Sequence, residues 1–383
     1  MKPINSWSRR AIALGAVTLV AAGGVAMTAS SASAKHQTSF TVIASGLDNP
    51  RGLALAGDGL LYVAETGLGS GNGAIGTQDG YGTTGGLTAI SGPRSKTPHQ
   101  TRVLSGLSSI GDQGDAVGLD GLSFSNGKLY GIFSTSAPFG NLGQLVQFQC
   151  TNALHTPSNC APLPTSRVVP IANVGAFNWG WTDTYKNEPW APPGQFPDSN
   201  PYGVLVSNGH RYVVDAGANT LNEIDGKGGV HVLAYFPQTP VSDAIPTCVT
   251  RGPDGVLYIG TLHLGDFFVN GPGQATIYRV DPKKTVADDL PTILSVATEW
   301  ATGLNTITGC AFDNRGHIDV VEMFTGQVVQ VSVKNPSGPR NIIGGEGQLI
   351  FPNGIAVASD GTIYVSDHSS NGPAEGRVVR IRV

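Results

Sequence analysis

The chain repeats one pattern of apolar and polar positions six times. Each copy contains an apolar stretch, a two-residue turn that ends in glycine, and a second stretch rich in Tyr and Val. In the first copy these are residues 52–55, the Asp58-Gly59 turn and residues 61–63. The later turns are Asn126-Gly127, Asn208-Gly209, Asp254-Gly255, Arg315-Gly316 and Asp360-Gly361. Because Asn-Gly and Asp-Gly favour the positive φ angles of tight hairpins, the pattern predicts a β-hairpin in each copy.

Two further stretches complete each copy. A third stretch follows the hairpin, as at residues 143–148, 326–331 and 376–381, and a fourth precedes the next copy, as at residues 102–104, 168–171 and 230–233. Four antiparallel strands repeated around an axis make a propeller blade. We therefore predict an all-β fold, a six-bladed β-propeller with four-stranded antiparallel blades. The chain ends on a third strand, so the N-terminal strand of the mature chain, residues 40–44, is predicted to close the last blade.

The four cysteines predict disulfide bonding. Cys150 and Cys160 flank a short polar loop and are predicted to pair. Cys248 and Cys310 occur at nearly equivalent positions of successive copies, but their registers differ by one residue. Such a shift turns one side chain to the other face of its sheet. Whether these two pair stays open on the sequence alone.

The first 34 residues predict an export signal. Lys2, Arg9 and Arg10 precede an uncharged stretch at residues 11–27, and Ala32-Ser33-Ala34 forms a cleavage site. Ser8-Arg9-Arg10 also resembles a twin-arginine signal. We expect cleavage after residue 34 to leave a secreted, extracellular bacterial protein with no membrane span. Residues 35–383 would form a single propeller with insertions at about 66–86 and 175–200.

The composition restricts the class of partner. The chain has 53 Gly and 25 Pro but only 13% charged residues, against about 25% charge in ordinary globular chains. This composition favours short strands and turns over helices. Lys and Arg total 23 against 27 Asp and Glu, so there is no basic excess for a nucleic acid. We expect a monomer that binds a small molecule, a polymer or a cell-surface or extracellular protein.

Acidic residues recur at one position of the repeat. Six residues after the turn glycine, the copies carry Glu65, Phe133, Asp215, Thr261, Glu322 and Asp367. Four acids that shared one pocket would need a cation such as Ca²⁺, which prefers oxygen ligands, or raised pKa values. Alternatively, each carboxylate accepts N–H groups of its own turn. The structural alternative is favoured.

Most of the chain resembles the ScyD/ScyE family of exported β-propellers, which are similar to NHL-repeat proteins. Residues 42–53, 61–65, 198–203, 245–247 and 253–255 carry the resemblance, which covers residues 38–383. It implies a secreted propeller without a settled enzymatic role. The first functional hypothesis is therefore a non-catalytic ligand-binding or scaffold protein.

A second resemblance suggests a hydrolase. Asn49, Asn200, Asn353 and Asp120 lie just before the first strands of their copies. Residues 352–355 and 120–122 resemble gluconolactonase and senescence-marker propellers, which bind a divalent cation in the central channel. The resemblance implies a Ca²⁺ site at Glu65, Asn200 and Asn353. The cation would polarise a carbonyl and activate water, so the alternative function is a Ca²⁺-dependent lactonase or esterase.

Aromatic residues and one histidine complete the candidates. The insertion at residues 175–200 contains Trp179, Trp181, Tyr185 and Trp190. These rings could stack on a ligand, although a role in pinning the insertion to the propeller is favoured. His263, in the loop after Thr261, is placed near the channel mouth. Without an identified partner, it is treated as a bystander rather than a base.

Overall fold

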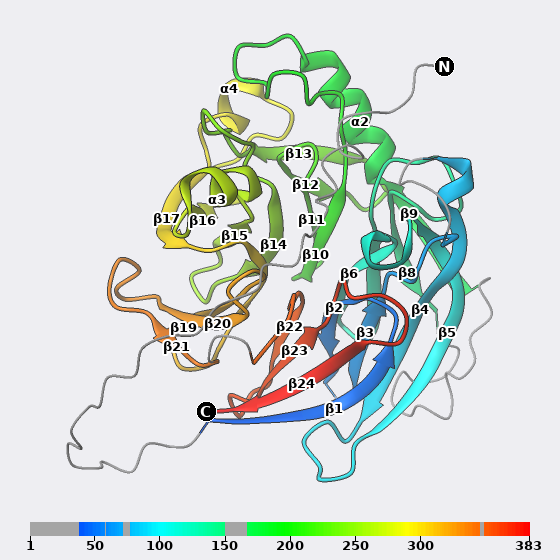
Figure 1. Ribbon diagram of the computed structural model, residues 1–383. Helices are drawn as coiled ribbons and strands as arrows, with labels where there is room; N and C mark the ends of the chain where they lie inside the picture. Colours follow the sequence, from blue (N-terminus) through cyan, green and yellow to red (C-terminus); the bar gives the residue numbers. More distant parts are fainter. Residues whose placement is uncertain (1–37, 58, 72–76, 150–166, 345–347) are drawn as a thin grey trace.

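The computed structural model describes residues 38–57, 59–71, 77–149, 167–344 and 348–383. Its strands form six four-stranded antiparallel sheets around a central axis (Figure 1). The predicted six-bladed propeller is confirmed. The predicted signal at residues 1–34 and the Cys150–Cys160 pair lie outside the described residues.

The strands of each blade follow one another from the central axis outwards. Blade 1 contains, from innermost to outermost, β2 (Pro50–Leu55), β3 (Leu61–Glu65), β4 (Tyr81–Ser91) and β5 (His99–Ile110). Blade 2 contains β6 (Leu119–Ser125), β7 (Lys128–Phe133), β8 (Gln144–Phe148) and β9 (Val168–Asn173). Blade 3 contains β10 (Pro201–Ser207), β11 (His210–Asp215), β12 (Thr220–Ile224) and β13 (Val230–Tyr235).

The remaining blades follow the same order. Blade 4 contains β14 (Pro246–Arg251), β15 (Leu257–Thr261), β16 (Ala275–Val280) and β17 (Thr298–Leu304). Blade 5 contains β18 (Ile307–Phe312), β19 (His317–Glu322), β20 (Gln327–Ser332) and β21 (Asn341–Ile342). Blade 6 contains β22 (Ile355–Val357), β23 (Ile363–Asp367), β24 (Gly376–Arg382) and β1 (Ser39–Leu47).

The two ends of the fold meet in blade 6. Strand β1 pairs antiparallel with β24, from Ser39 opposite Arg382 to Leu47 opposite Gly376. In Figure 1 these are the blue and red strands that lie side by side. The predicted closure of the last blade by the N-terminal strand is confirmed.

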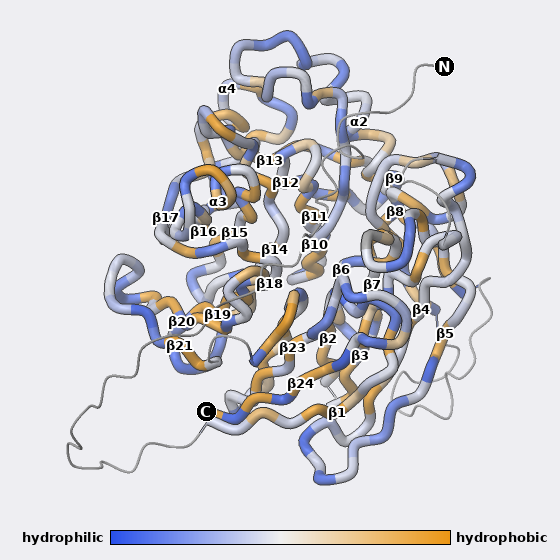
Figure 2. The backbone as a smooth tube through the Cα atoms, in the orientation of Figure 1, coloured by the Kyte–Doolittle hydropathy of each residue, from blue (hydrophilic) through white to orange (hydrophobic). Residues whose placement is uncertain are grey.

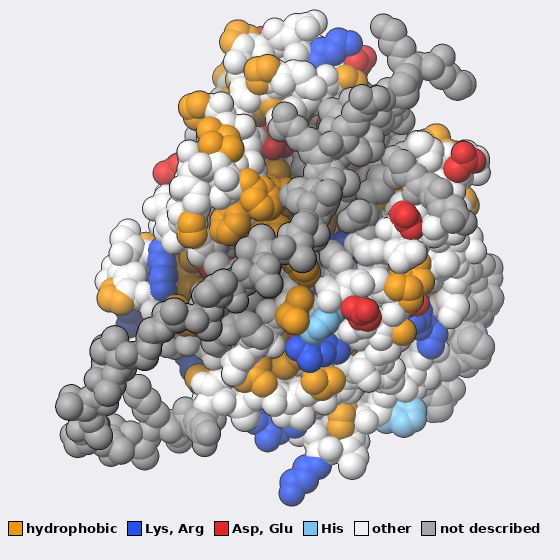
Figure 3. All heavy atoms as spheres, viewed as in Figure 1, with side chains coloured by type: hydrophobic (Ala, Val, Ile, Leu, Met, Phe, Trp, Pro, Cys, Tyr) orange, Lys and Arg blue, Asp and Glu red, His pale blue; other side chains and the backbone are white. Residues whose placement is uncertain are grey.

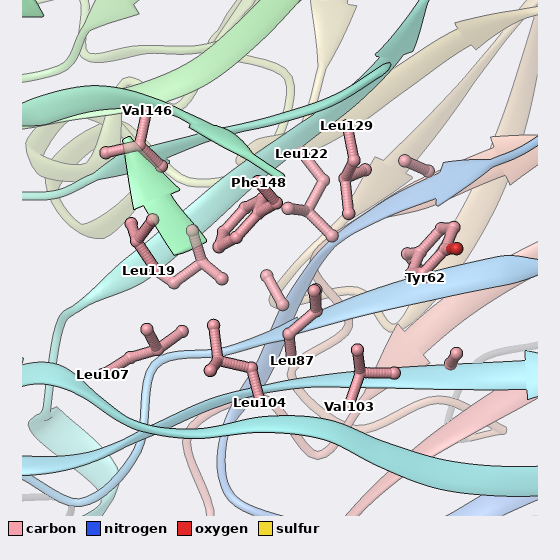
Figure 4. Packing of buried hydrophobic residues seen from close by; sticks show 14 of the residues in the cluster. Tyr62, Leu87, Val103, Leu104, Leu107, Leu119, Leu122, Leu129, Val146 and Phe148 are labelled. Carbon is pink, nitrogen blue, oxygen red and sulfur yellow. The ribbon is translucent and has the colours of Figure 1, made fainter. Parts of the chain in front are cut away.

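Packing between blades buries second strands along their whole length. The second strands β3, β15 and β23 are buried at every position, because each blade is covered by a neighbour on both faces. In Figure 2 the orange stretches accordingly follow the strands, whereas the outer loops are largely blue or white. Figure 4 shows one such interface, where Leu87 and Leu104 of blade 1 pack with Leu122 and Phe148 of blade 2.

The two ends of the ring carry different loops. Innermost strands begin where second strands end, as the pairing of Pro246 with Thr261 shows. We call this end the insertion face and the opposite end, which carries the Gly turns, the hairpin face. The insertion face carries α2 (Val174–Tyr185), α3 (Leu264–Asn270) and the 3₁₀ turns η1 (Gln78–Gly80) and η2 (Gln113–Asp115), whereas α4 (Leu290–Ile293) joins β16 to β17. In the described part of the chain, no helix is long and apolar enough to cross a membrane.

The question left open about Cys248 and Cys310 is settled by the structure. They form a disulfide between β14 and β18, with an S–S distance of 2.05 Å and Cα atoms 5.8 Å apart. The strands belong to neighbouring blades, which pack face to face. One cysteine must point from its sheet towards the next blade, and the other must point back from the opposite face of its own sheet. Because side chains alternate between faces, a one-residue difference in register gives these two directions.

Candidate functional site

Six equivalent residues surround the axis where the innermost strands begin. Each precedes the strand-opening glycine of its blade, or Cys248 in blade 4, and we call them the polar ring. They are Arg51, Asp120, Tyr202, Thr247, Thr308 and Asn353. The glycines let neighbouring strands approach closely, since a Cβ on Gly52 would lie 2.6 Å from the Asp120 carbonyl oxygen.

Two cavities meet at the polar ring. One is the central channel, of about 280 Å³, which is enclosed by all six innermost strands. The other, of about 230 Å³, opens among the loops of the insertion face, and we call it the mouth cavity. Tyr202, Thr247 and Thr308 line both. The polar ring is therefore the entrance to the channel, and four of its members, Arg51, Tyr202, Thr247 and Thr308, form the floor of the mouth cavity.

Tyr202 connects opposite sides of the ring. Its hydroxyl oxygen accepts hydrogen bonds from Asn353 Nδ2 at 2.5 Å and from Arg51 Nη1 at 3.4 Å. Arg51 Nη2 also donates to Ser370 Oγ at 3.4 Å. Burial raises the pKa of Tyr202, so the phenol stays protonated at neutral pH.

Asp120 and Arg51 place opposite charges on the two sides of the ring. Asp120 lines the channel and Arg51 lines the mouth cavity, with 3.9 Å between Asp120 Oδ1 and Arg51 Nε. Asp120 is 2% exposed, and neither of its oxygens accepts a hydrogen bond from a described residue. Burial raises its pKa to about 7, although the positive charge of Arg51 opposes the shift.

The two threonines of the ring connect the blades. Thr247 Oγ1 donates to the Ile307 carbonyl at 2.6 Å, and Thr308 Oγ1 donates to the Pro352 carbonyl at 3.1 Å. Each hydroxyl therefore donates its proton to a backbone carbonyl of the next blade. The charged and amide groups that can meet a ligand at the ring therefore come from blades 1, 2 and 6, with the Tyr202 phenol from blade 3.

Left-handed residues with a branched or bulky side chain precede three innermost strands. The φ angles are 54° at Ile245, 29° at Thr306 and 46° at Phe351. This conformation is costly for residues with a branched or bulky side chain and persists where the surrounding contacts hold it. Ile245 N–H donates to Asn219 Oδ1 at 2.8 Å, and the Ile245 side chain belongs to the wall of the mouth cavity.

The four repeated acids do not come together. Glu65, Asp215, Glu322 and Asp367 are buried, and none of them lines either cavity. Each accepts a backbone N–H just before its blade's innermost strand: Asp48 to Glu65 at 2.9 Å, Asn200 to Asp215 at 2.7 Å, Asn305 to Glu322 at 2.9 Å and Ile350 to Asp367 at 2.6 Å. Among these four described residues, only Asp215 also accepts backbone N–H groups of its own turn, from Gly217 and Ala218, so turn capping in the predicted form applies to that acid.

The three suggested Ca²⁺ ligands have separate partners. Glu65 accepts hydrogen bonds from Thr88 and Arg102 at 2.6 Å each, and burial raises its pKa. Asn200 lines the mouth cavity, with Oδ1 3.2 Å from the Thr135 N–H, and Asn353 lines the channel. Within the described ranges, no group of three or more His, Cys, Asp or Glu side chains could hold a metal. Ca²⁺ binding stays a prediction, and native mass spectrometry of the purified protein tests it.

His263 lies behind the wall of the mouth cavity. It is the residue just before the first turn of α3 and is 3% exposed, with Nδ1 3.5 Å from Asp266 Oδ2. Burial lowers its pKa, so the imidazole is neutral at neutral pH. Its neighbours Leu262 and Leu264 line the cavity, whereas His263 does not.

Three of the four aromatic candidates pack on one another. Trp181 lies 5.0 Å from Tyr185 and 5.7 Å from Trp190, measured between ring centroids. Trp190 lies 4.8 Å from Tyr235 of β13. These rings fix the 175–200 insertion to blade 3. Trp179 is half-buried and makes no ring contact within the described residues.

Arg51 and Tyr202 are two ring residues that the sequence patterns do not indicate. Asn49 and Asn200 lie three residues before their glycines, whereas Asp120 and Asn353 lie one residue before theirs. These four residues therefore occupy two different positions of the repeat, although all of them lie just before an innermost strand. Alignment on the strand-opening glycine would have identified the whole ring.

Comparisons with known proteins support the fold alone. No family model matches the sequence, and no curated protein matches it either. A glucose dehydrogenase-type oxidoreductase from Thermus thermophilus superposes with a TM-score of 0.53 at 15% identity, covering 90% of this chain and 100% of that chain. The PQQ-bound aldose sugar dehydrogenase of Streptomyces coelicolor gives 0.54 at 13% identity, covering 91% and 99%.

A gluconolactonase-type protein gives a TM-score of 0.42 at 10% identity, over 70% of this chain and 88% of that chain. This value is too low to support the hydrolase alternative. The structural neighbours are thus β-propellers of the NHL and PQQ types, and membership of the ScyD/ScyE family stays a prediction.

Proposed function

We propose that this protein is a ligand-binding β-propeller that holds one small molecule in the mouth cavity. The observation that carries the proposal is the composition of this cavity. Its floor is formed by four members of the polar ring, and its walls include apolar residues of three loops. The floor residues are Arg51, Tyr202, Thr247 and Thr308, and the apolar wall residues are Ile245, Leu262, Leu264, Met323 and Phe324. An apolar hollow with a few convergent polar groups is the usual form of a small-molecule site.

Binding is favoured over catalysis by the charges around the cavity. Arg51 is the only charged residue among the described residues that line it. The repeated carboxylates accept hydrogen bonds within their own blades, so their oxygens are not directed to a reacting group in the cavity. Hydrolysis and sugar oxidation are therefore not proposed for this chain.

We also propose that the protein acts outside the cell, as an exported propeller of the ScyD/ScyE type. Two observations support this location. The first 34 residues have the pattern of an export signal, and Cys248 and Cys310 form a disulfide, which persists in oxidising compartments.

A blocking variant tests the ligand site. Ser370 lines the mouth cavity, so Ser370→Trp fills it from a loop. Ser359→Trp, on the exposed hairpin face of the same blade, is the matched control. Thermal unfolding is measured with organic anions, organic cations, sugars and neutral apolar compounds. We expect a ligand that raises the Tm of the native protein and of Ser359→Trp but not of Ser370→Trp. The proposal is wrong if every ligand that binds raises the Tm of the two variants equally. It is also wrong if no compound raises the Tm of the native protein.

A further inference from the structure

The mouth cavity has a polar side and an apolar side. Arg51 and Ser370 belong to blades 1 and 6, and Arg51 Nη2 donates to Ser370 Oγ. Leu262 and Leu264 flank the start of α3 in blade 4, and Phe324 follows β19 in blade 5. A ligand that fills the cavity would contact the guanidinium at one end and an apolar wall at the other.

Aromatic rings build the apolar wall. The half-buried Phe324 ring stacks on Phe267 at 5.5 Å and 17°, and it meets Phe268 at 5.4 Å and Phe351 at 5.8 Å edge-on. Phe268 is 52% exposed, and Figure 3 shows hydrophobic side chains gathered over α3 on this face. Three neighbouring rings fix the position of Phe324, so it offers a flat surface at little cost in side-chain entropy.

The positive charge on the polar side favours a negatively charged ligand. Arg51 lines the mouth cavity, whereas Asp120, the one acid of the polar ring, lines the channel and not the mouth cavity. A ligand in the mouth therefore meets the cation before the carboxylate. The two terminal nitrogens of Arg51 donate to Tyr202 and Ser370 over 3.4 Å each, and a guanidinium can pair two of its N–H groups with the two oxygens of a carboxylate.

Building on the proposed function, we infer that the ligand is a compact aromatic carboxylate, with its anionic group at Arg51 and its ring against Phe324. The cavity, at about 230 Å³, lies below the roughly 300–1,000 Å³ of drug-sized sites. This size suits one or two fused rings rather than a long chain. Met323 adds a polarisable thioether to the same wall.

Three related probes test the inference by isothermal titration calorimetry. Naphthalene-2-carboxylate carries both features, naphthalene-2-carboxamide lacks the charge, and octanoate lacks the ring. We expect the aromatic carboxylate to bind about tenfold more tightly than the other two. Its affinity should fall between 50 and 500 mM NaCl, because salt screens a charge pair, whereas that of the carboxamide should not.

Two variants test the two ends of the mouth cavity separately, one at Arg51 and one at Phe324. Arg51→Gln should abolish the preference for carboxylate over carboxamide, with circular dichroism and Tm recorded to show that the variant folds. Phe324→Leu should weaken both aromatic probes about 3- to 10-fold and leave their ratio unchanged, as expected for the loss of a ring contact. Phe312→Leu, at the hairpin end of the same blade, is the control and should bind both as the native protein does.

The outcomes separate this inference from the function on which it rests. If the carboxamide or octanoate binds as tightly as the aromatic carboxylate and Ser370→Trp blocks it, the mouth cavity binds ligands but the inferred class is wrong. If Arg51→Gln does not fold, the salt series on the native protein decides the role of charge. If Ser370→Trp has no effect on any probe, the proposed function fails as well.

Discussion

Asp120 is held in surroundings that oppose its charge. Its carboxylate lies at the entrance to the channel, almost completely buried, and it accepts no hydrogen bond from a described residue. Arg51 approaches to 3.9 Å, which is beyond hydrogen-bonding distance. Burial therefore dominates and raises the pKa of Asp120 from 3.8 to about 7. The folded protein binds a proton at Asp120 more tightly than the unfolded chain does.

This pKa gives a pH dependence that can be measured. Between pH 4 and 7 the folded state retains a proton that the unfolded state releases, so the contribution of Asp120 to the free energy of unfolding falls as pH rises. Asp120→Asn removes this titration. The stability of the variant relative to the native protein should rise by about 2–3 kcal/mol between pH 5 and pH 8. Urea unfolding at both pH values measures the difference.

An exposed acid provides the comparison for this substitution. Asp183→Asn, on the outer side of α2, should differ from the native protein by less than about 0.5 kcal/mol at both pH values. Arg51 keeps its charge throughout this range, so the loss of its nearby carboxylate adds a constant offset and no slope. A pH-independent difference for Asp120→Asn would show that Asp120 is ionised throughout.

The ring residues also show why a site is harder to predict than the fold. The hairpin turns depend on neighbouring residues such as Asn126 and Gly127, so the sequence pattern indicates them directly. Tyr202, by contrast, receives hydrogen bonds from Arg51 and Asn353, each 151 residues away. No pattern of neighbouring residues in the sequence indicates which ring members form hydrogen bonds across the axis. Their common place before the strand-opening glycine was present in the sequence, but their contacts depend on the closed ring.

At the level of elements, Asp215 connects the 175–200 insertion to blade 3. Its Oδ1 accepts N–H groups of Asn200, Gly217 and Ala218 at 2.7–3.0 Å. Its Oδ2 accepts from Ser199 Oγ at 2.6 Å and from Asn178 Nδ2, on α2, at 2.7 Å. One carboxylate thus fixes the turn after β11, the entry to β10 and a helix of the insertion.

Replacement of this carboxylate should loosen the insertion. Asp215→Asn places an amide N–H₂ where donors already converge, so at least one buried donor loses its acceptor. We expect a loss of about 2–4 kcal/mol in the free energy of unfolding, since bonds to charged groups contribute about 1.5–3 kcal/mol each. Limited proteolysis should cut residues 175–200 earlier than in Asp183→Asn. Equal cleavage and stability in the two variants would contradict this role.

The disulfide connects two innermost strands of neighbouring blades. Cys248 stands where the other five blades have glycine, and it bonds to Cys310 of β18. The sequence shows that both lie near the start of a strand. The alternation of side chains between two faces describes residues of one sheet, whereas these cysteines belong to two sheets. Across an interface between sheets, side chains that point in opposite directions can meet.

Loss of this bond should lower stability without changing the fold. The residues are separated by 62 positions, and closing a loop of this length removes unfolded-state entropy equivalent to about 4 kcal/mol. The Cys248→Ala, Cys310→Ala double variant should therefore melt several degrees below the native protein. Its far-ultraviolet circular dichroism should be unchanged. A Tm equal to that of the oxidised native protein would show that the bond does not constrain the unfolded chain.

At the scale of the whole molecule, the ring is closed by hydrogen bonds between its two ends. The repeat in the sequence predicted the six blades and the assignment of the N-terminal strand to the last one, because the final copy lacks a fourth strand. Strand β1 supplies that strand and buries Ile43, Ala44 and Leu47 in the core between blades 6 and 1. Without it, β24 would be an exposed edge with unpaired backbone groups.

Removal of β1 should open the ring and destabilise every blade interface that depends on closure. A chain that begins at residue 48 loses three buried apolar side chains, which contribute roughly 4–6 kcal/mol together, and its ladder to β24. We expect a Tm about 10 °C or more below that of a chain that begins at residue 38, with dimers or larger species in size-exclusion chromatography as free edges pair. A peptide of residues 38–47, added in trans, should restore the monomer and part of the Tm, whereas a scrambled peptide should not. A monomeric truncated chain that melts with the control would mean that the blade interfaces hold the ring without β1.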